Sequence, residues 1–174
     1  MMYLTDREDY LNRERTRNSN NTSINNYNCA GWALKTFCWF SPYNKKDMMN
    51  RFDSLYYTDA DSIKQEEISE IEDRFLWEDV DYLLNTFKNL KIIDSIDEVD
   101  DNDTVIAYRI GVFKFANELD YDFHFKVRRK GKWSEKTGGF PPHECEEEEV
   151  FDAWINPYDD FHYSSDLILF KMEE

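Results

Sequence analysis

The first half of the chain has apolar residues at helical spacing. Asn28 is a good N-cap residue, and the apolar residues behind it predict a helix that begins at Cys29. Ser41-Pro42 is expected to end that helix, because proline is disfavoured inside a helix. A second helical stretch is predicted after Asp47, through Met48, Phe52 and Leu55.

Two further signals predict helix between residues 62 and 90. Ser62-Ile63-Lys64-Gln65 has the form of a capping box, and apolar residues follow it on one face. The clearest helical pattern covers residues 78–90. Its apolar stripe consists of Val80, Leu83, Leu84, Phe87 and Leu90.

After Leu90 the period changes from helical to alternating. Strands are predicted over residues 91–96, 104–110, 121–129, 132–136 and 166–172. The turn between the third and fourth of these is Lys130-Gly131, so the two form a hairpin. Helices followed by a run of strands predict an α+β fold with an antiparallel sheet.

Residues 1–26 show almost no apolar periodicity and are expected to form an N-terminal arm, with residues 27–174 as a single domain. The loop predicted over residues 138–149 contains Gly138-Gly139, Pro141-Pro142 and a run of glutamates. The 174 residues suffice for one hydrophobic core, and 17% of them are aromatic, which excludes a disordered chain.

Charge and cysteine content narrow the function classes. The formal net charge is −16; residues 1–46 carry +3 and residues 47–174 carry −19. Residues 47–174 are acidic enough to repel the phosphates of nucleic acids, which argues against direct nucleic-acid binding. No apolar stretch is long enough for a membrane span, and no hydrophobic signal sequence opens the chain. Three widely spaced cysteines predict no disulfide framework, which favours a reducing, cytoplasmic compartment.

Cys29 and His124 form the most informative pair. A cysteine at a helix start is a plausible nucleophile, because backbone N–H groups and the helix dipole stabilise a thiolate and can hold an oxyanion. The small residues Ala30 and Gly31 are expected to leave room for a substrate. His124 lies on the polar side of an alternating strand, where it can serve as a base.

The other cysteines and histidines are weaker candidates. Cys38 falls in the last turn of the same predicted helix and is expected to be core. Cys145 stands beside four glutamates, which raise a thiol pKa. His143-Glu144-Cys145 has no second ligand cluster to complete a metal site, so neither metal nor cofactor is expected. His162 is expected at the surface and is a reserve base.

The run Asn28-Cys29-Ala30-Gly31-Trp32-Ala33-Leu34 resembles the nucleophile motif of papain-like amidases and peptidases of the NlpC/P60 and related bacterial groups. Residues 122–125 and 131–138 are similar to a segment of bacterial and phage proteins with His at a strand start, a hairpin and a Trp-Ser return. The resemblance covers roughly residues 25–139 and the last strand. It implies a papain-like fold with helices packed on the sheet.

The resemblance also implies that Cys29 is the nucleophile and His124 the general base in cleavage of an amide or thioester bond. The third residue departs from the pattern, since Glu135 stands where the segment more often has His. A tight turn brings Glu135 near His124, with Ser134 and Asp122 as alternatives. Residues flanking the motifs are the expected contacts of a peptide or protein substrate: Tyr27, Asn28, Trp32, Trp133 and Ser134.

A second hypothesis is non-enzymatic. Acidic runs at 94–103 and 144–152 favour an inhibitor that imitates nucleic acid and blocks a basic protein surface, as many phage anti-CRISPR proteins do. The predicted hairpin is the exception in this acidic body. It concentrates six basic residues in eleven, which favours either a charge-protected edge or an anion-binding rim: Lys126, Arg128, Arg129, Lys130, Lys132 and Lys136.

Overall fold

An antiparallel sheet forms the centre of the molecule. The computed structural model describes residues 27–138, 140–157 and 161–173, so the predicted arm over residues 1–26 lies outside it. Within this part of the chain the sheet has six strands in the order β1-β6-β2-β3-β4-β5, and every neighbouring pair is antiparallel. The strands are β1 (Leu90–Ile93), β2 (Thr104–Phe115), β3 (Glu118–Arg129), β4 (Lys132–Glu135), β5 (His143–Glu144) and β6 (Ile168–Met172). The predicted α+β class with an antiparallel sheet is confirmed.

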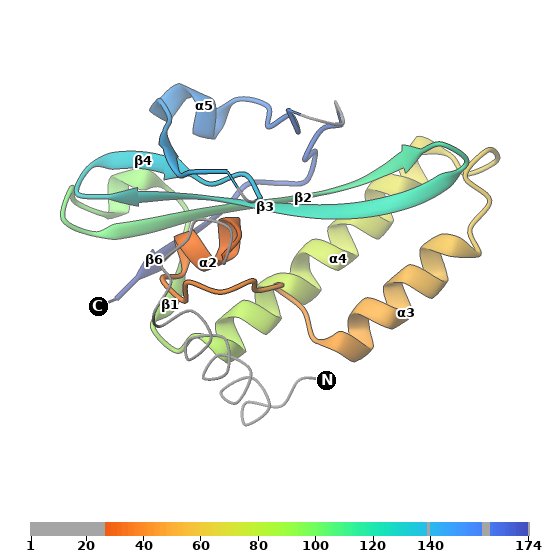
Figure 1. Cartoon of the computed structure of the whole chain (residues 1–174), viewed down its shortest axis with the longest axis horizontal. Helices are drawn as coiled ribbons and strands as arrows, with labels where there is room; N and C mark the ends of the chain where they lie inside the picture. Colours follow the sequence, from red (N-terminus) through yellow and green to blue (C-terminus); the bar gives the residue numbers. More distant parts are fainter. Residues whose placement is uncertain (1–26, 139, 158–160, 174) are drawn as a thin grey trace.

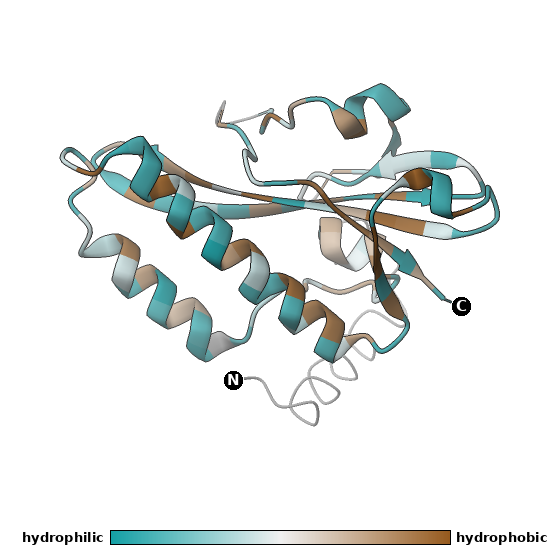
Figure 2. Ribbon diagram, turned by 180° about the vertical axis from the view of Figure 1, so that it is seen from behind, coloured by the Kyte–Doolittle hydropathy of each residue, from teal (hydrophilic) through white to brown (hydrophobic). Residues whose placement is uncertain are grey.

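Helices cover the two faces of the sheet unequally. The helices α2 (Cys29–Ala33), α3 (Lys45–Tyr56) and α4 (Gln65–Thr86) lie on one face, and α5 (Glu147–Phe151) lies on the other (Figure 1). Figure 2 shows hydrophobic and hydrophilic residues alternating along α4, as expected for a helix that packs by one side. A 3₁₀ turn, η2 (Ile96–Glu98), follows β1. Among the described residues, no helix has the length and apolar character needed to cross a bilayer.

The alternation of β3 places its apolar side chains on one face of the sheet, in the larger of two hydrophobic cores. Tyr121, Phe125 and Val127 belong to the larger core, between the sheet and the helices α2 and α4. Trp133 of β4 belongs to a smaller core with Val150 and Trp154, on the face covered by α5. His124 lies on the polar side of β3, as predicted, yet it is 8% exposed because the smaller core's residues cover it.

The helix that begins at Cys29 is much shorter than predicted. It ends at Ala33, because Lys35 and Phe37 have positive φ angles of 54° and 50° and turn the chain back over the helix. Gly31 permits this close return: a Cβ there would lie 2.2 Å from the Cys38 carbonyl oxygen. The room expected beside Gly31 is therefore filled by the protein's own backbone. Cys38 is outside the helix, although it is fully buried as expected.

Several other helices and strands also begin or end at residues that differ from the predicted ones. The capping box at Ser62 does not form: α4 begins at Gln65, its N-cap is Lys64, and no side chain caps it. The pattern over 78–90 is the second half of this helix, which ends at Thr86. The strand expected over 104–110 continues through Gly111 to Phe115. The loop expected over 138–149 contains the short strand β5 and the start of α5.

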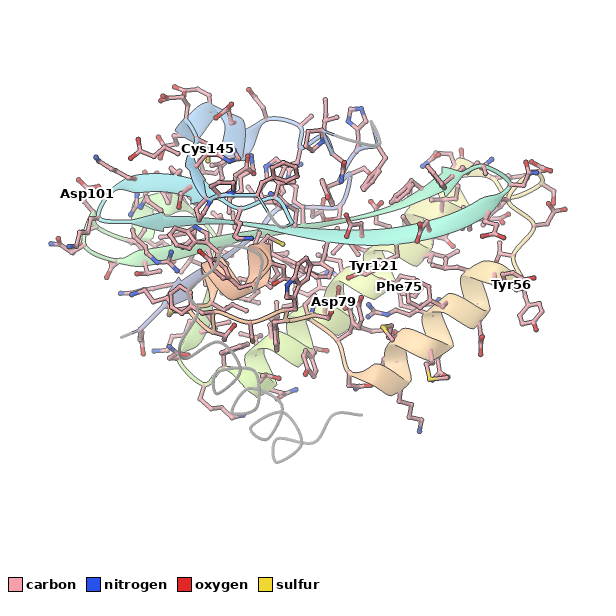
Figure 3. The ribbon with its side chains drawn as sticks, in the orientation of Figure 1. Tyr56, Phe75, Asp79, Asp101, Tyr121 and Cys145 are labelled. Atoms are coloured by element: carbon pink, nitrogen blue, oxygen red, sulfur yellow. The ribbon has the colours of Figure 1, made fainter. Side chains whose placement is uncertain are left out.

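A charged cluster is buried between α3, α4 and the sheet. Asp79 is fully buried, and its Oδ1 lies 2.6 Å from Arg51 Nη1. The Tyr108 hydroxyl donates to Asp79 Oδ2 at 2.7 Å, and the Tyr121 hydroxyl donates to the same oxygen. Figure 3 shows Asp79, Tyr121 and Phe75 close together in this layer. Because one ion pair joins α3 to α4 and the tyrosines tie it to β2 and β3, the cluster fixes both helices against the sheet.

Candidate active site

Cys29 and His124 meet where α2 packs against β3. Cys29 is the first residue of α2, and His124 lies in the middle of β3. Both are buried, at 7% and 8% exposure. Both side chains line the same pocket, and the Cys29 thiol is close enough to the His124 imidazole to raise its pKa. The two residues that the sequence paired, 95 positions apart, therefore meet in one site.

Glu135 completes a line of three side chains. His124 Nε2 lies 2.7 Å from Glu135 Oε2, across the neighbouring strands β3 and β4. Since Nε2 is engaged by the carboxylate, Nδ1 is the ring nitrogen left for the thiol. Of the three candidates for an orienting residue, Glu135 has this position. Asp122 instead accepts from the Tyr163 hydroxyl, and Ser134 accepts from the Trp32 indole.

The pKa values of the pair move in opposite directions. Burial lowers the pKa of His124, but hydrogen bonds and charge from Cys29 and Glu135 outweigh it and raise the pKa to about 9. Burial raises the pKa of Glu135, but the hydrogen bond to His124 and nearby positive charge lower it to about 2. At neutral pH the imidazole therefore holds its proton next to an ionised carboxylate.

Two further basic groups contact Glu135. Lys126 Nζ lies 3.4 Å from Oε2, and His143 Nε2 lies 3.1 Å from Oε1. Lys126 is buried, whereas the His143 side chain is 54% exposed. Glu135 thus bridges a buried histidine and a surface histidine, and its fixed position orients the His124 ring.

Two aromatic rings hold the imidazole on its other sides. The Tyr163 ring stacks on His124 with centroids 5.5 Å apart, and the Trp154 ring meets it edge-on at 5.7 Å. Tyr163 is itself fixed, because its hydroxyl donates to Asp122 Oδ2 at 2.8 Å and accepts from Asn156 Nδ2 at 3.1 Å. Sequence reasoning missed both rings; they lie outside any periodic pattern, in the segment between α5 and β6.

Asn28 is a structural residue in the described geometry. Its Oδ1 accepts from the backbone N–H groups of Gly31 and Phe40, at 3.0 and 3.3 Å, and its Nδ2 donates to the Phe40 carbonyl at 2.8 Å. It therefore holds the start of α2 to the returning loop, in agreement with the predicted N-cap. The Gly31 N–H is thereby engaged and is not available to an oxyanion. Because α2 has five residues, His124 is a stronger source of positive charge at Cys29 than the helix dipole.

The other expected substrate contacts are occupied by packing. Tyr27 stacks on Trp32, whose indole Nε1 donates to Ser134 Oγ at 3.1 Å. Trp133 is 3% exposed in the smaller core. Of the five residues proposed to bind substrate, Asn28 lines the smaller pocket described below, and the other four line neither pocket.

The basic hairpin is largely internal, which corrects both expectations for it. Arg128 donates to the Asp100 carbonyl at 2.7 Å, and Arg129 donates to the Trp32 and Ala33 carbonyls at 2.6 and 2.9 Å. Lys136 is fully buried; its Nζ donates to the Tyr27 carbonyl at 2.5 Å and to the Gly138 carbonyl. Backbone carbonyls therefore bind three of the six basic side chains, Lys126 pairs with Glu135, and Lys130 and Lys132 are exposed.

The remaining candidates stay outside the site. Burial, opposed by Lys126 and reinforced by Glu135 and neighbouring glutamates, raises the pKa of the Cys145 thiol to about 11, so it is a poor nucleophile, as expected. His162 is exposed and pairs with Ile155 through the backbone. In the part of the chain that the structure describes, His, Cys, Asp and Glu form no group suited to a metal ion.

Two pockets meet at His124. The smaller, of about 360 Å³, is lined by Cys29 and His124 together with both polar and aromatic residues, among them Asn28, Asp122 and Phe123. The larger, of about 810 Å³, is lined by His124, Glu135 and a mixture of charged and apolar residues. Both pockets include Thr137, Phe140 and Tyr163, so they are neighbours. The nucleophile candidate therefore has a cavity beside it in which a substrate carbonyl can be placed.

No protein-family model, curated protein or solved structure matches this chain.

Proposed function

We propose that this protein is a cysteine-dependent hydrolase of the papain-like type, which cleaves an amide or thioester bond in a peptide or protein. The observation that carries the proposal is the buried line from the Cys29 thiol through the His124 imidazole to the Glu135 carboxylate. A nucleophile, a base and an orienting residue in this order are the arrangement that covalent acyl transfer needs.

The order of these groups supports the papain-like assignment. The cysteine opens a helix, the histidine lies on a strand of the sheet that this helix packs against, and the carboxylate lies on the neighbouring strand. This is the order that the resemblance of residues 28–34 and 122–138 implies. Glu135 takes the orienting position in place of the more usual histidine.

The reaction follows from the protonation of the pair. A His124 imidazolium next to Cys29 stabilises the thiolate, which attacks the substrate carbonyl carbon. As the tetrahedral intermediate collapses, His124 gives its proton to the leaving nitrogen, or to sulfur in a thioester. His124 then takes a proton from water, which attacks the Cys29 thioester and releases the acid. Throughout, Glu135 keeps Nε2 engaged and Nδ1 directed at the sulfur.

Alkylation of Cys29 tests the proposal without a known substrate. Iodoacetamide labelling at pH 7, followed by mass spectrometry of each cysteine, should modify Cys29 faster than Cys145. We expect His124→Ala to slow labelling of Cys29 at least about tenfold, because the imidazolium that stabilises the thiolate is lost. His162→Ala is the matched control and should leave the rate unchanged. A Cys29 that labels equally slowly with and without His124 would contradict the proposal.

The acidic inhibitor remains the alternative hypothesis. In its two acidic runs several carboxylates bind neighbouring backbone: Glu98 accepts from the Asp94 and Ser95 N–H groups, and Glu149 accepts from the Glu146 N–H. An inhibitor of this kind would keep its partner binding in Cys29→Ala and lose it in high salt.

A further inference from the structure

The larger pocket shares His124 with the smaller pocket but does not include Cys29. This asymmetry assigns the two pockets to different ends of the scissile bond. In the proposed reaction the carbonyl carbon must lie at the Cys29 sulfur, and the leaving nitrogen must lie at the imidazole that protonates it. The acyl group then occupies the smaller pocket, and the leaving amine extends past His124 into the larger one.

The wall of the larger pocket favours apolar groups. Phe140, Pro142, Trp154 and Ile155 line it. Phe140 and Ile155 are 56% and 51% exposed, so this wall is open to an incoming side chain. A volume of about 810 Å³ exceeds what an amino-acid side chain needs. A phenylalanine side chain is favoured in such a site because binding removes its apolar surface from water.

The charges around the pocket disfavour anions. The exposed carboxylates Glu149 and Asp152 line it together with Glu135. The two basic side chains in the described lining besides His124 are Lys126 and His143, and both are bound to Glu135. An anionic group in the pocket would therefore meet three carboxylates and cations that already have a partner.

We propose that the larger pocket is the leaving-group subsite, and that it selects an amine with a bulky apolar side chain and rejects one with a carboxylate side chain. This assignment rests on the proposed hydrolase function and adds the class of substrate. It places specificity on the side of the bond that departs first, while the smaller pocket takes the acyl group.

Acyl transfer to chosen amines tests the subsite. 4-Nitrophenyl acetate would acetylate Cys29, with release of 4-nitrophenolate. Added phenylalanine amide, glycine amide or aspartic acid α-amide then competes with water for the thioester. The amine nitrogen bonds to the acetyl carbon, the carbon–sulfur bond breaks, and the amine proton returns through His124 to the thiol. Mass spectrometry of the N-acetyl amides gives the partition, normalised to the reaction of each amine with a free acetyl thioester.

We expect phenylalanine amide to be acetylated about ten times faster than glycine amide, and aspartic acid α-amide more slowly than glycine amide. Ile155→Ser should reduce the preference for phenylalanine several-fold, and Asp152→Asn should raise the rate with aspartic acid α-amide. Ile92→Ser is the control, because Ile92 is similarly exposed, at 41%, on the distant strand β1. Acetylated Cys29 with equal rates for all three amines overturns the subsite alone. Failure of Cys29 to acetylate overturns both proposals.

Discussion

Glu135 holds His124 from the neighbouring strand although the two are not directly paired in the sheet. The register pairs Glu135 with Lys126, two residues beyond His124, and the carboxylate reaches back to Nε2 at 2.7 Å. Diagonal neighbours on one face of an antiparallel pair are within reach of a long side chain. Aspartate, one methylene shorter, would have less reach for this contact, which accounts for glutamate at this position.

The first prediction concerns the protonation of His124. Removing the carboxylate with Glu135→Gln should lower the His124 pKa from about 9 by more than one unit, because one of the two groups that raise it is lost. Titration of the imidazole Cε1 proton by NMR measures this directly. His143→Ala and His162→Ala assign the resonances of the two exposed histidines, and His162→Ala serves as the control. An unchanged His124 titration in Glu135→Gln would contradict the role of this carboxylate.

The same pair predicts how stability depends on pH. The His124 pKa is raised from 6.5, so its contribution is fully present below about pH 6.5 and is lost as the pH rises through about 9. The Glu135 pKa is lowered from 4.5, so its contribution is present above about pH 4.5 and is lost as the pH falls through about 2. The difference in unfolding free energy between wild type and Glu135→Gln should therefore be largest between pH 4.5 and 6.5. Urea denaturation across pH 3–10 checks this; a difference that stays constant with pH refutes it.

A third prediction addresses the buried Arg51–Asp79 pair. Arg51→Met should destabilise the fold by about 3–5 kcal/mol at pH 8, because Asp79 loses its counterion in a fully buried site. Burial already raises the pKa of Asp79 to about 6, against the lowering effect of Arg51. At pH 5 the carboxyl is protonated and the cost of Arg51→Met should shrink. Arg51→Met combined with Asp79→Asn should recover much of the stability; no recovery would show that the loss comes from packing.

The fourth prediction concerns the loop that returns over α2. Gly31→Ala should destabilise the protein by about 1–3 kcal/mol, since the added Cβ would lie 2.2 Å from the Cys38 carbonyl oxygen. Gly138→Ala is the control: its Cβ would meet no atom within 4 Å, so the substitution adds only the backbone strain of a side chain at a positive φ of 52°. Thermal unfolding distinguishes the two. Cys29 labelling should also slow in Gly31→Ala, because the displaced loop carries the start of α2 with it.

Much of the candidate site follows from local sequence. The N-cap Asn28, the alternation that turns His124 to the polar face, and the tight turn that returns Glu135 are all short-range signals. The early end of α2 is different. It depends on positive φ angles at Lys35 and Phe37, and lysine and phenylalanine rarely adopt this conformation, so the sequence does not predict it.

The rest of the site required contacts that no local pattern encodes. Trp154 and Tyr163 themselves lie outside the helices and strands, yet both rings contact the His124 imidazole. The prediction that the basic hairpin is a charged surface was wrong, because composition does not show which hydrogen-bond acceptors will surround the basic side chains. Arg128, Arg129 and Lys136 bind backbone carbonyls from three separate parts of the chain, and these partners are known only once the fold is known.

Arg129 has a consequence for motion at the site. Its guanidinium donates to the carbonyls of Trp32 and Ala33, at the end of the helix that Cys29 begins. Arg129 belongs to β3, the strand that also carries His124. The helix α2 carries the nucleophile and the strand β3 carries the base. The two elements are therefore linked at both ends of α2, by Cys29 and His124 at its start and by the Arg129 guanidinium at its end. Displacements of α5, which contributes Glu149 to the larger pocket, can open or narrow that pocket while the sulfur-to-imidazole separation stays nearly constant.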